Sequence, residues 1–192
     1  MRKSTVLALL MIVSIIALSI TACSKQDRIG LVKTFEAAYN NHDVEDALAL
    51  LAEGTVLEKD IRKFNGLDKI RALARYDSVM NARWTFADLQ QKGDSVVFRA
   101  VERSEWFRLI GVDEYRYDTC IMTFEGERIK SIRLVSSPIT ARILGMGLQS
   151  VADWASDERL VQLNDLLSSG FTQESAQGWL DILSAWREET KK

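Results

Sequence analysis

The sequence is poor in the residues that build compact reactive sites. It holds one proline, one histidine and two cysteines among 192 residues. Because a structural zinc site or a redox motif needs several Cys or His side chains, these counts exclude Cys/His metal clusters and a Cys-x-x-Cys motif. A carboxylate-only metal site stays open, and we expect no resident cofactor. With so little proline and no low-complexity run, the chain is expected to be globular rather than disordered.

An excess of charge of one sign is also lacking. Lys and Arg number 25 against 27 Asp and Glu, which gives a net charge of −2 with no basic block. Since nucleic-acid binding needs a basic patch or stripe, nucleic acid is not an expected partner. Apolar residues make up 47% and charged residues 27%, a balance typical of one domain, or of one domain with an extension.

The first residues, "MRKSTVLALLMIVSIIALSITAC", differ from the rest of the chain. Two cations precede an uncharged apolar run over residues 6–20, and small residues follow. This is the three-part pattern of a secretory signal. The alternative is a transmembrane helix, but the run is shorter than the roughly 20 apolar residues that a span needs.

The end of this segment, "ITAC", resembles the lipobox of bacterial lipoproteins. The resemblance implies that residues 1–22 are a signal peptide and that Cys23 is lipid-modified, with residues 23–27 as a tether. Ser24 in place of Asp implies transfer to the outer membrane, so we expect a lipid-anchored, periplasm-facing protein held at the membrane by its N-terminal lipid. The mature chain then keeps only Cys120 besides the acylated cysteine, so it forms no internal disulfide.

Apolar periodicity predicts helices in the first part of the mature chain. Residues 28–41 carry one apolar face at helical spacing. Asp43 can cap a second helix, and Gly54 suits its C-terminal end. After a short extended piece that ends in a turn at Asn65-Gly66, residues 67–80 repeat the helical pattern.

The pattern then changes to strands. Residues 83–91, 95–107, 114–124 and 128–137 are β-rich or alternating, and glycine-containing turns separate them. Such hairpin spacing predicts an antiparallel meander of at least four strands. Helices followed by a meander predict an α+β fold, with the helices against one face of a curved sheet.

The chain from residue 138 onward is expected to be helical. Pro138 after two serines marks a helix start, and Thr172 can cap a last helix. Three tryptophans, Trp154, Trp179 and Trp186, give this extension a large apolar load that must be buried. We expect the extension, residues 138–192, to pack on the preceding domain and cover its mouth. A homodimer through the sheet is the alternative.

Three segments carry a family resemblance: "FEAAYNNHDVEDALALLAEGTVL", "NGLDKIRAL" and "FEGERIKSIRLVSS". They resemble the NTF2-like superfamily, which includes SnoaL-like and ketosteroid-isomerase-like proteins, over residues 28–137. The resemblance implies a cone in which a bent sheet wraps around the first helix and leaves a pocket. This fold hosts isomerases, cyclases, dehydratases, ligand binders and scaffolds, so it does not decide the function.

The isomerase chemistry of that superfamily is not carried by the matching positions. They hold Phe35, Lys59 and Cys120 where the resemblance would require a tyrosine donor, a carboxylate base and a protonated carboxyl. We therefore lean toward a protein that is not an enzyme. His42 lies in the connection between the first two helices and is interpreted as a solvated loop residue.

Two interpretations of function follow. The first is a non-enzymatic module that binds a small apolar ligand or a protein partner, and its pocket has no acid/base pair. That pocket would be lined by Phe35, Cys120, Met122, Ile132 and Leu134. The second is a SnoaL-like isomerase, dehydratase or cyclase for a small hydrophobic substrate, with one inward carboxylate held by a second polar group. The carboxylates considered for that role are Asp60, Glu102 and Asp118.

The charged stretch 101–118 bears on this choice. Ion pairs across a solvent-exposed hairpin explain its density of charge in the simplest way. The alternative is that Glu102 or Asp118 points inward and meets a polar ligand.

Overall fold

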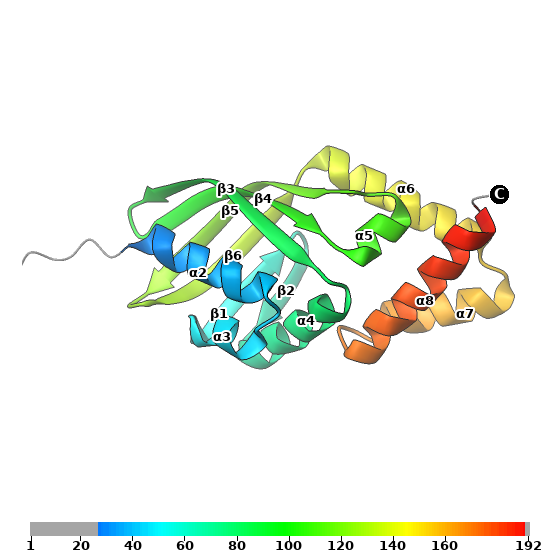
Figure 1. The fold of residues 1–192 in the computed structure, drawn as a ribbon, viewed down its shortest axis with the longest axis horizontal. Helices are drawn as coiled ribbons and strands as arrows, with labels where there is room; N and C mark the ends of the chain where they lie inside the picture. Colours follow the sequence, from blue (N-terminus) through cyan, green and yellow to red (C-terminus); the bar gives the residue numbers. More distant parts are fainter. Residues whose placement is uncertain (1–26, 191–192) are drawn as a thin grey trace, which may run out of the picture.

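The computed structural model describes residues 27–190 and shows one curved sheet with helices on its inner face and at one end (Figure 1). The predicted signal peptide and Cys23 lie outside the described residues. Within residues 27–190, no helix is both long enough and apolar enough to cross a membrane. The elements in chain order are α2 (Arg28–Asn40), α3 (Val44–Ala49), β1 (Leu51–Lys59), β2 (Arg62–Asn65), α4 (Leu67–Val79), β3 (Arg83–Lys92), β4 (Ser95–Arg103), α5 (Glu105–Ile110), β5 (Tyr115–Glu125), β6 (Arg128–Ser136), α6 (Pro138–Trp154), α7 (Asp157–Ser168) and α8 (Gln173–Thr190).

The α+β class is confirmed, but the sheet is larger and more mixed than the predicted antiparallel meander. Six strands lie in the order β2-β1-β6-β5-β4-β3, and β1 pairs with β6 in parallel. Gly54 lies inside β1, so its predicted place at a helix end is wrong. Pairing with β6 makes this segment a strand. Ile129 N donates to Leu50 O at 2.9 Å, and Thr55 Oγ1 donates to Ile129 O at 2.7 Å.

The strand predicted over residues 95–107 ends earlier, at Arg103. Ser104 caps α5 by accepting a hydrogen bond from Phe107 N at 3.2 Å, and Gly111 ends this helix at a positive φ of 92°. The predicted helix starts at Asp43 and Pro138 are confirmed. Asp43 accepts from Asp46 N at 3.4 Å, and Pro138 is the first residue of α6.

The inner face of the sheet encloses one apolar core with α2. This helix packs on β3 and β4, while α4 packs on β1 and β2. The residues of this core are almost fully buried, among them Val32 and Phe35 of α2 and Met122 of β5. Aromatic rings extend this core: Trp84 stacks on Tyr39 with 4.3 Å between the ring centroids.

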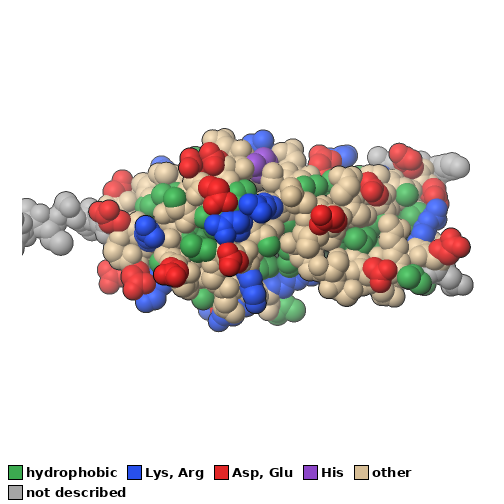
Figure 2. Space-filling view, turned by 90° about the horizontal axis from the view of Figure 1, so that it is seen from below, with side chains coloured by type: hydrophobic (Ala, Val, Ile, Leu, Met, Phe, Trp, Pro, Cys, Tyr) green, Lys and Arg blue, Asp and Glu red, His purple; other side chains and the backbone are tan. Residues whose placement is uncertain are grey.

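The three C-terminal helices gather at one end of the cone, beside α4 and α5 (Figure 1). Helix α8 packs on α4 and α5, and α6 packs on α5 and β5. Trp179 and Trp186 are buried there, and Trp154 donates from Nε1 to Glu189 at 3.0 Å. The face seen in Figure 2 mixes acidic and basic side chains without a broad area of one sign.

Candidate active site

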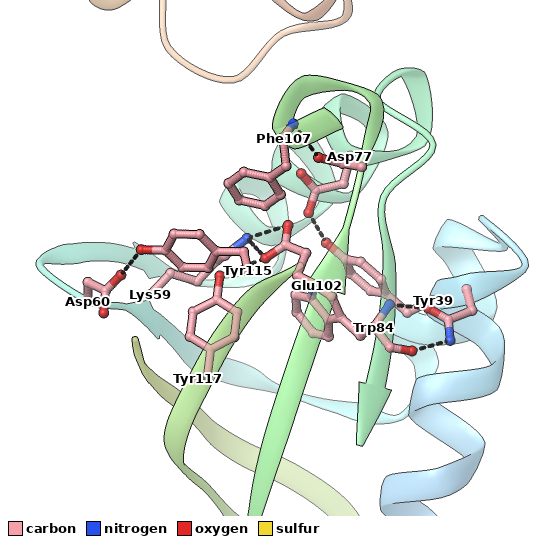
Figure 3. A network of polar contacts seen from close by, with 11 residues as sticks. Tyr39, Lys59, Asp60, Asp77, Trp84, Glu102, Phe107, Tyr115 and Tyr117 are labelled. Carbon is pink, nitrogen blue, oxygen red and sulfur yellow. Dashed lines mark hydrogen bonds and ion pairs between the residues drawn. The ribbon is translucent and has the colours of Figure 1, made fainter. Parts of the chain in front are cut away.

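A cavity of about 610 Å³ lies where the cone meets the C-terminal helices. Ligand sites usually measure roughly 300–1,000 Å³, so the space suits a small molecule. The cone contributes residues from the β1–β2 hairpin, α4, β4, α5 and β5, and the C-terminal helices contribute the remaining wall. The polar side chains of this cavity come from the cone, and most lie in a few neighbouring hydrogen-bonded groups (Figure 3).

Glu102 is at the centre of that cluster. It follows Val96, Phe98 and Ala100 on the inward face of β4, and its exposed fraction is 3%. Lys59 Nζ lies 3.1 Å from Glu102 Oε1 and 3.0 Å from Oε2. Tyr117 donates from its hydroxyl to Oε2 at 2.6 Å. The buried carboxylate therefore has both a cation and a hydrogen-bond donor, as a buried charge requires.

The protonation of Lys59 and Tyr117 follows from this contact. Burial acts to lower the pKa of Lys59, but the carboxylates of Glu102 and Asp77 act in the opposite direction and the pKa is raised. Burial together with the negative charge of Glu102 raises the pKa of Tyr117 well above its usual value. At neutral pH Lys59 is thus a cation, and Tyr117 is a neutral donor.

Asp77 is a second buried carboxylate, contributed by α4. Its exposed fraction is 4%, and Tyr39 donates from its hydroxyl to Oδ2 at 2.5 Å. Within residues 27–190 no donor contacts the other oxygen, Oδ1. The pKa of Asp77 is raised to about 6, mainly by burial and further by the charge of Glu102, against the opposing effects of Lys59 and the Tyr39 hydrogen bond. A carboxyl group that titrates near neutral pH beside a cavity is suited to proton transfer.

Asp60 also lines the cavity, but it has a structural task. Its Oδ1 accepts from Ser136 N at 2.7 Å, and its Oδ2 accepts from the Tyr115 hydroxyl at 3.3 Å. Its φ of 55° places it in the left-handed region at the β1–β2 turn, where Asp is tolerated. These bonds hold the turn against β5 and β6.

Two further donors border the cavity. Tyr76 lines it, and burial raises the pKa of its hydroxyl, with the charge of Asp77 adding to the effect. Its hydroxyl makes no hydrogen bond within the described part of the chain. Trp106 also lines the cavity, and its buried Nε1 has no hydrogen-bond partner among residues 27–190.

The predicted carboxylates separate into two groups. Asp60 and Glu102 reach the cavity, whereas Asp118 is exposed to solvent. A register shift in β5 between Tyr117 and Thr119 causes this, because it leaves two consecutive residues facing outward. The interpretation of the whole hairpin as a solvated charged surface is wrong for Glu102. It does describe Arg103 and Arg116, which pair with Glu114 at the surface.

The predicted apolar lining lies elsewhere. None of the five predicted residues lines the cavity, because all are almost fully buried in the core between α2 and the sheet: Phe35, Cys120, Met122, Ile132 and Leu134. Burial raises the pKa of the Cys120 thiol to about 12, so it is unreactive at neutral pH. The expectation of a pocket without paired polar groups is therefore wrong, since Lys59 and Glu102 form such a pair.

His42 takes no part in this cluster. It lies in the α2–α3 connection with a φ of 58°, and its Nε2 is 3.4 Å from Asn81 Oδ1. Of the three positions matched to isomerase residues, only Lys59 lines the cavity.

Sequence reasoning missed Asp77, Tyr39 and Tyr117. A signal for Asp77 was present, because it lies at helical spacing after Ile70 and Leu73, on the buried face of α4. A carboxylate on such a face needs a partner or a function. Tyr39 lies at helical spacing on the apolar face of residues 28–41, and nothing in the sequence links its hydroxyl to Asp77, 38 positions away.

The polar groups of the cavity are suited to acid/base chemistry. No group of three or more His, Cys, Asp or Glu side chains within residues 27–190 is arranged to hold a metal ion. Asp77 can accept or release a proton near neutral pH, while Lys59 and Tyr76 can donate hydrogen bonds to an oxygen atom. The apolar remainder of the cavity can hold a hydrophobic body.

Comparison with solved structures supports the fold. The epoxide hydrolase/cyclase-like enzyme SalBIII, described in pyran ring formation in the polyether salinomycin, aligns with a TM-score of 0.53 and 16% identity over 60% of this chain and 95% of its own. A protein from Kribbella flavida aligns with a TM-score of 0.51 and 12% identity, over 65% and 95%. An NTF2-like protein of unknown function from Cytophaga hutchinsonii aligns at 0.48 and 14%, over 58% and 91%.

Comparison of sequences identifies the family. No curated protein matches this chain. The family model described as the SnoaL-like domain matches residues 32–132, which is more than half of the chain and contains Tyr39, Asp77, Glu102 and Tyr117. The chain therefore belongs to the SnoaL-like domain family.

Proposed function

We propose that this protein is a SnoaL-like enzyme that moves a proton within a small, largely apolar substrate bearing a carbonyl or epoxide oxygen. Isomerisation, dehydration and ring closure are the reaction classes that such a step serves. The observation that carries the proposal is Asp77, a buried carboxyl with a pKa of about 6, beside the Lys59–Glu102 pair in one cavity.

Each polar group has a defined part in this chemistry. Asp77 as a carboxylate takes a proton from the carbon α to the substrate carbonyl, so that negative charge develops on the oxygen, and as an acid it returns the proton. Tyr39 orients Asp77 through the 2.5 Å hydrogen bond to Oδ2 and leaves Oδ1 for the substrate. Lys59 and Tyr76 stabilise the negative charge that develops on the substrate oxygen.

The Lys59–Glu102–Tyr117 contacts keep this site polar and ordered. Glu102 raises the pKa of Lys59, so the ammonium group stays charged although it is buried. Tyr117 restrains the Glu102 carboxylate at 2.6 Å. A preorganised donor acts without reorganisation cost when charge develops, which is how such sites lower a barrier. The fold shared with the cyclase-like enzyme SalBIII supports the same reaction class.

Deuterium exchange tests the proposal without knowledge of the natural substrate. Cyclic and open-chain ketones are incubated with the protein in D₂O, and loss of the α-proton signals is followed by ¹H NMR. The exchange rate should exceed that of buffer and rise with pH through about 6, as Asp77 loses its proton. Asp77→Asn should abolish the acceleration, while Asp118→Asn, at an exposed carboxylate, should retain it. Ketones that bind but exchange no faster than with Asp77→Asn would overturn the proposal.

A binding module without turnover is the second candidate function. The observation in its favour is that Lys59 and Tyr117 already satisfy Glu102, so one of the two buried carboxylates has its partners within the protein. Mass spectrometry of molecules that co-purify with the protein, combined with absent exchange on the whole ketone panel, would favour this candidate.

We also propose that the protein is lipid-anchored through Cys23 and faces the periplasm from the outer membrane. The support is the sequence "ITAC" after an apolar run, followed by Ser24. Mass spectrometry of the N-terminal peptide from bacterial membranes should show an acylated Cys23. A Cys23→Ala variant that fractionates with the membrane as the natural protein does would contradict the anchor.

A further inference from the structure

The two halves of the cavity differ in chemistry according to the part of the chain that builds them. Its carboxylate and phenolic groups and the ammonium of Lys59 come from the cone: Lys59, Asp60, Tyr76, Asp77, Glu102, Tyr115 and Tyr117. The C-terminal helices and their connection contribute, besides Gly170, only apolar side chains: Leu144, Leu148, Leu166, Leu167, Phe171 and Trp179. The cavity therefore has a polar end and an apolar end.

Phe171 joins the two parts. It follows Gly170, which has a φ of 73°, in the α7–α8 connection. Its ring meets Phe64 and Tyr76 of the cone edge-on, each at 5.1 Å between centroids. The guanidinium of Arg62 lies 5.3 Å from the same ring. Phe171 thus lies next to Tyr76, the neighbour of the proposed base, and borders the apolar end.

We infer that the substrate is an amphiphile, with one oxygen-bearing head at Asp77 and Lys59 and an extended apolar tail recognised by the C-terminal helices. Leu148, Phe171 and Trp179 are then specificity-determining residues. The position of the head rests on the proposed function. The recognition of the tail rests on the lining alone.

The SnoaL-like domain does not supply this selectivity by itself. The family model ends at residue 132, before α6 begins at Pro138. All the apolar residues named for the second half lie beyond that limit. The C-terminal helices therefore convert a general polar site into one that selects for apolar length.

Calorimetric titration with butanone, octanone and dodecanone tests the inference on the full chain. Each added methylene that enters the apolar end should tighten binding by about fourfold, since burying one is worth about 0.8 kcal/mol. Binding should also show a negative heat-capacity change that grows with chain length. An affinity that does not depend on chain length would overturn the inference.

Variants at the apolar end locate the recognition. Leu148→Trp fills space, so it should weaken dodecanone by roughly tenfold or more while changing butanone far less. Phe171→Ala should flatten the dependence on chain length. Leu167→Ala should flatten it in part, and Leu167 is 63% exposed, so this change perturbs folding little. Val161→Ala, on an exposed face of α7 outside the cavity lining, is the matched control and should bind like the natural protein.

The outcomes separate this inference from the proposed function. Length-dependent binding without deuterium exchange would reject the enzyme and keep the tail site. Exchange with length-independent affinity would reject the tail site and keep the enzyme. If Leu148→Trp and Phe171→Ala alter binding no more than Val161→Ala, although thermal unfolding shows them folded, the C-terminal helices do not select the ligand.

Discussion

The inner face of the sheet is apolar at one end and charged at the other, although the same strands build both ends. On β4 the inward positions run from Val96 and Phe98 to Ala100 and then Glu102. On β5 they run from Met122 and Cys120 to Tyr117 and Tyr115. The apolar end packs against α2 as a sealed core, and the charged end opens to the cavity. The inward side chains of each strand thus change from apolar to polar along its length, although the strand stays in the same sheet.

The difference between the two ends shows that the residues that stabilise the fold and the residues suited to chemistry occupy different ends of the same sheet. At the sealed end every inward side chain gains free energy by burial. At the cavity end two carboxylates are buried and a lysine is partly buried, and each has a partner within hydrogen-bond distance. Residues that would be poor choices for a core are concentrated at the cavity.

Of the variants described, removal of Glu102 at the charged end should lower the free energy of unfolding most. Glu102→Ala leaves Lys59 as a buried cation without its partner and Tyr117 without an acceptor. The free energy of unfolding should fall by about 3–5 kcal/mol, measured by urea denaturation. The double variant Lys59→Met/Glu102→Leu should recover most of this loss, because no charge is then left unpaired. A loss below about 1 kcal/mol in the single variant would show that Glu102 is not essential to the cluster.

A truncation at the sealed end should lower stability without touching the chemistry. Met122→Ala creates a cavity beside Cys120 and Ile132, all buried. The free energy of unfolding should fall by about 2–5 kcal/mol. Below the unfolding temperature, ketone affinity and the pH dependence of exchange should match the natural protein. A shifted pH dependence of exchange would show that the sealed end and the cavity end are coupled, which would contradict their separate roles in stability and chemistry.

The sequence predicted the sealed end of the cone far better than its cavity end. Hairpin spacing placed most of the strands, and burial of Phe35 and Met122 follows from apolar periodicity alone. Local patterns predict the second half of β1 as an extended piece but assign its start, before Gly54, to a helix, because the pairing of β1 with β6 joins residues far apart in the chain.

The cavity end depends on contacts of the same long-range kind. Tyr39 and Asp77 come from two different helices, and Lys59 and Glu102 from two strands that are not neighbours in the sheet. Glu102 shares the inward face of β4 with Phe98, but the density of charge in residues 101–118 favours a surface interpretation of the sequence. The register shift that turns Asp118 outward has no sequence signal of its own.

The carboxyl of Asp77 should make stability depend on pH in the direction opposite to an ion-paired surface carboxylate. Its pKa in the folded protein, about 6, lies above the usual 3.8, so the fold disfavours its charged form. This penalty is complete above about pH 6 and disappears as the pH falls toward about 4. Asp77→Asn should therefore stabilise the protein at pH 8 by roughly 2–3 kcal/mol, and the gain should vanish near pH 4.

Chemical denaturation of both proteins across this pH range measures the effect. The same variant is expected to lose proton exchange, so stability and activity should change in opposite directions. Equal stability of the two proteins at every pH would show that the fold does not disfavour the Asp77 charge.

The smallest change in stability is expected at Asp118, on the outer face of the β4–β5 hairpin. Comparison with Glu102 on the inner face shows how much depends on the direction in which the side chain points. Glu102→Gln and Asp118→Asn are matched neutral replacements on adjacent strands, one with a buried side chain and one exposed. Glu102→Gln should lower the free energy of unfolding by about 1.5–3 kcal/mol, because it weakens charged hydrogen bonds. Asp118→Asn should change it by less than about 0.5 kcal/mol. Equal effects, measured side by side in urea, would mean that Asp118 has an interaction at the surface that matches the buried pair. A large difference would assign the stability cost to burial, since the chemical change is the same.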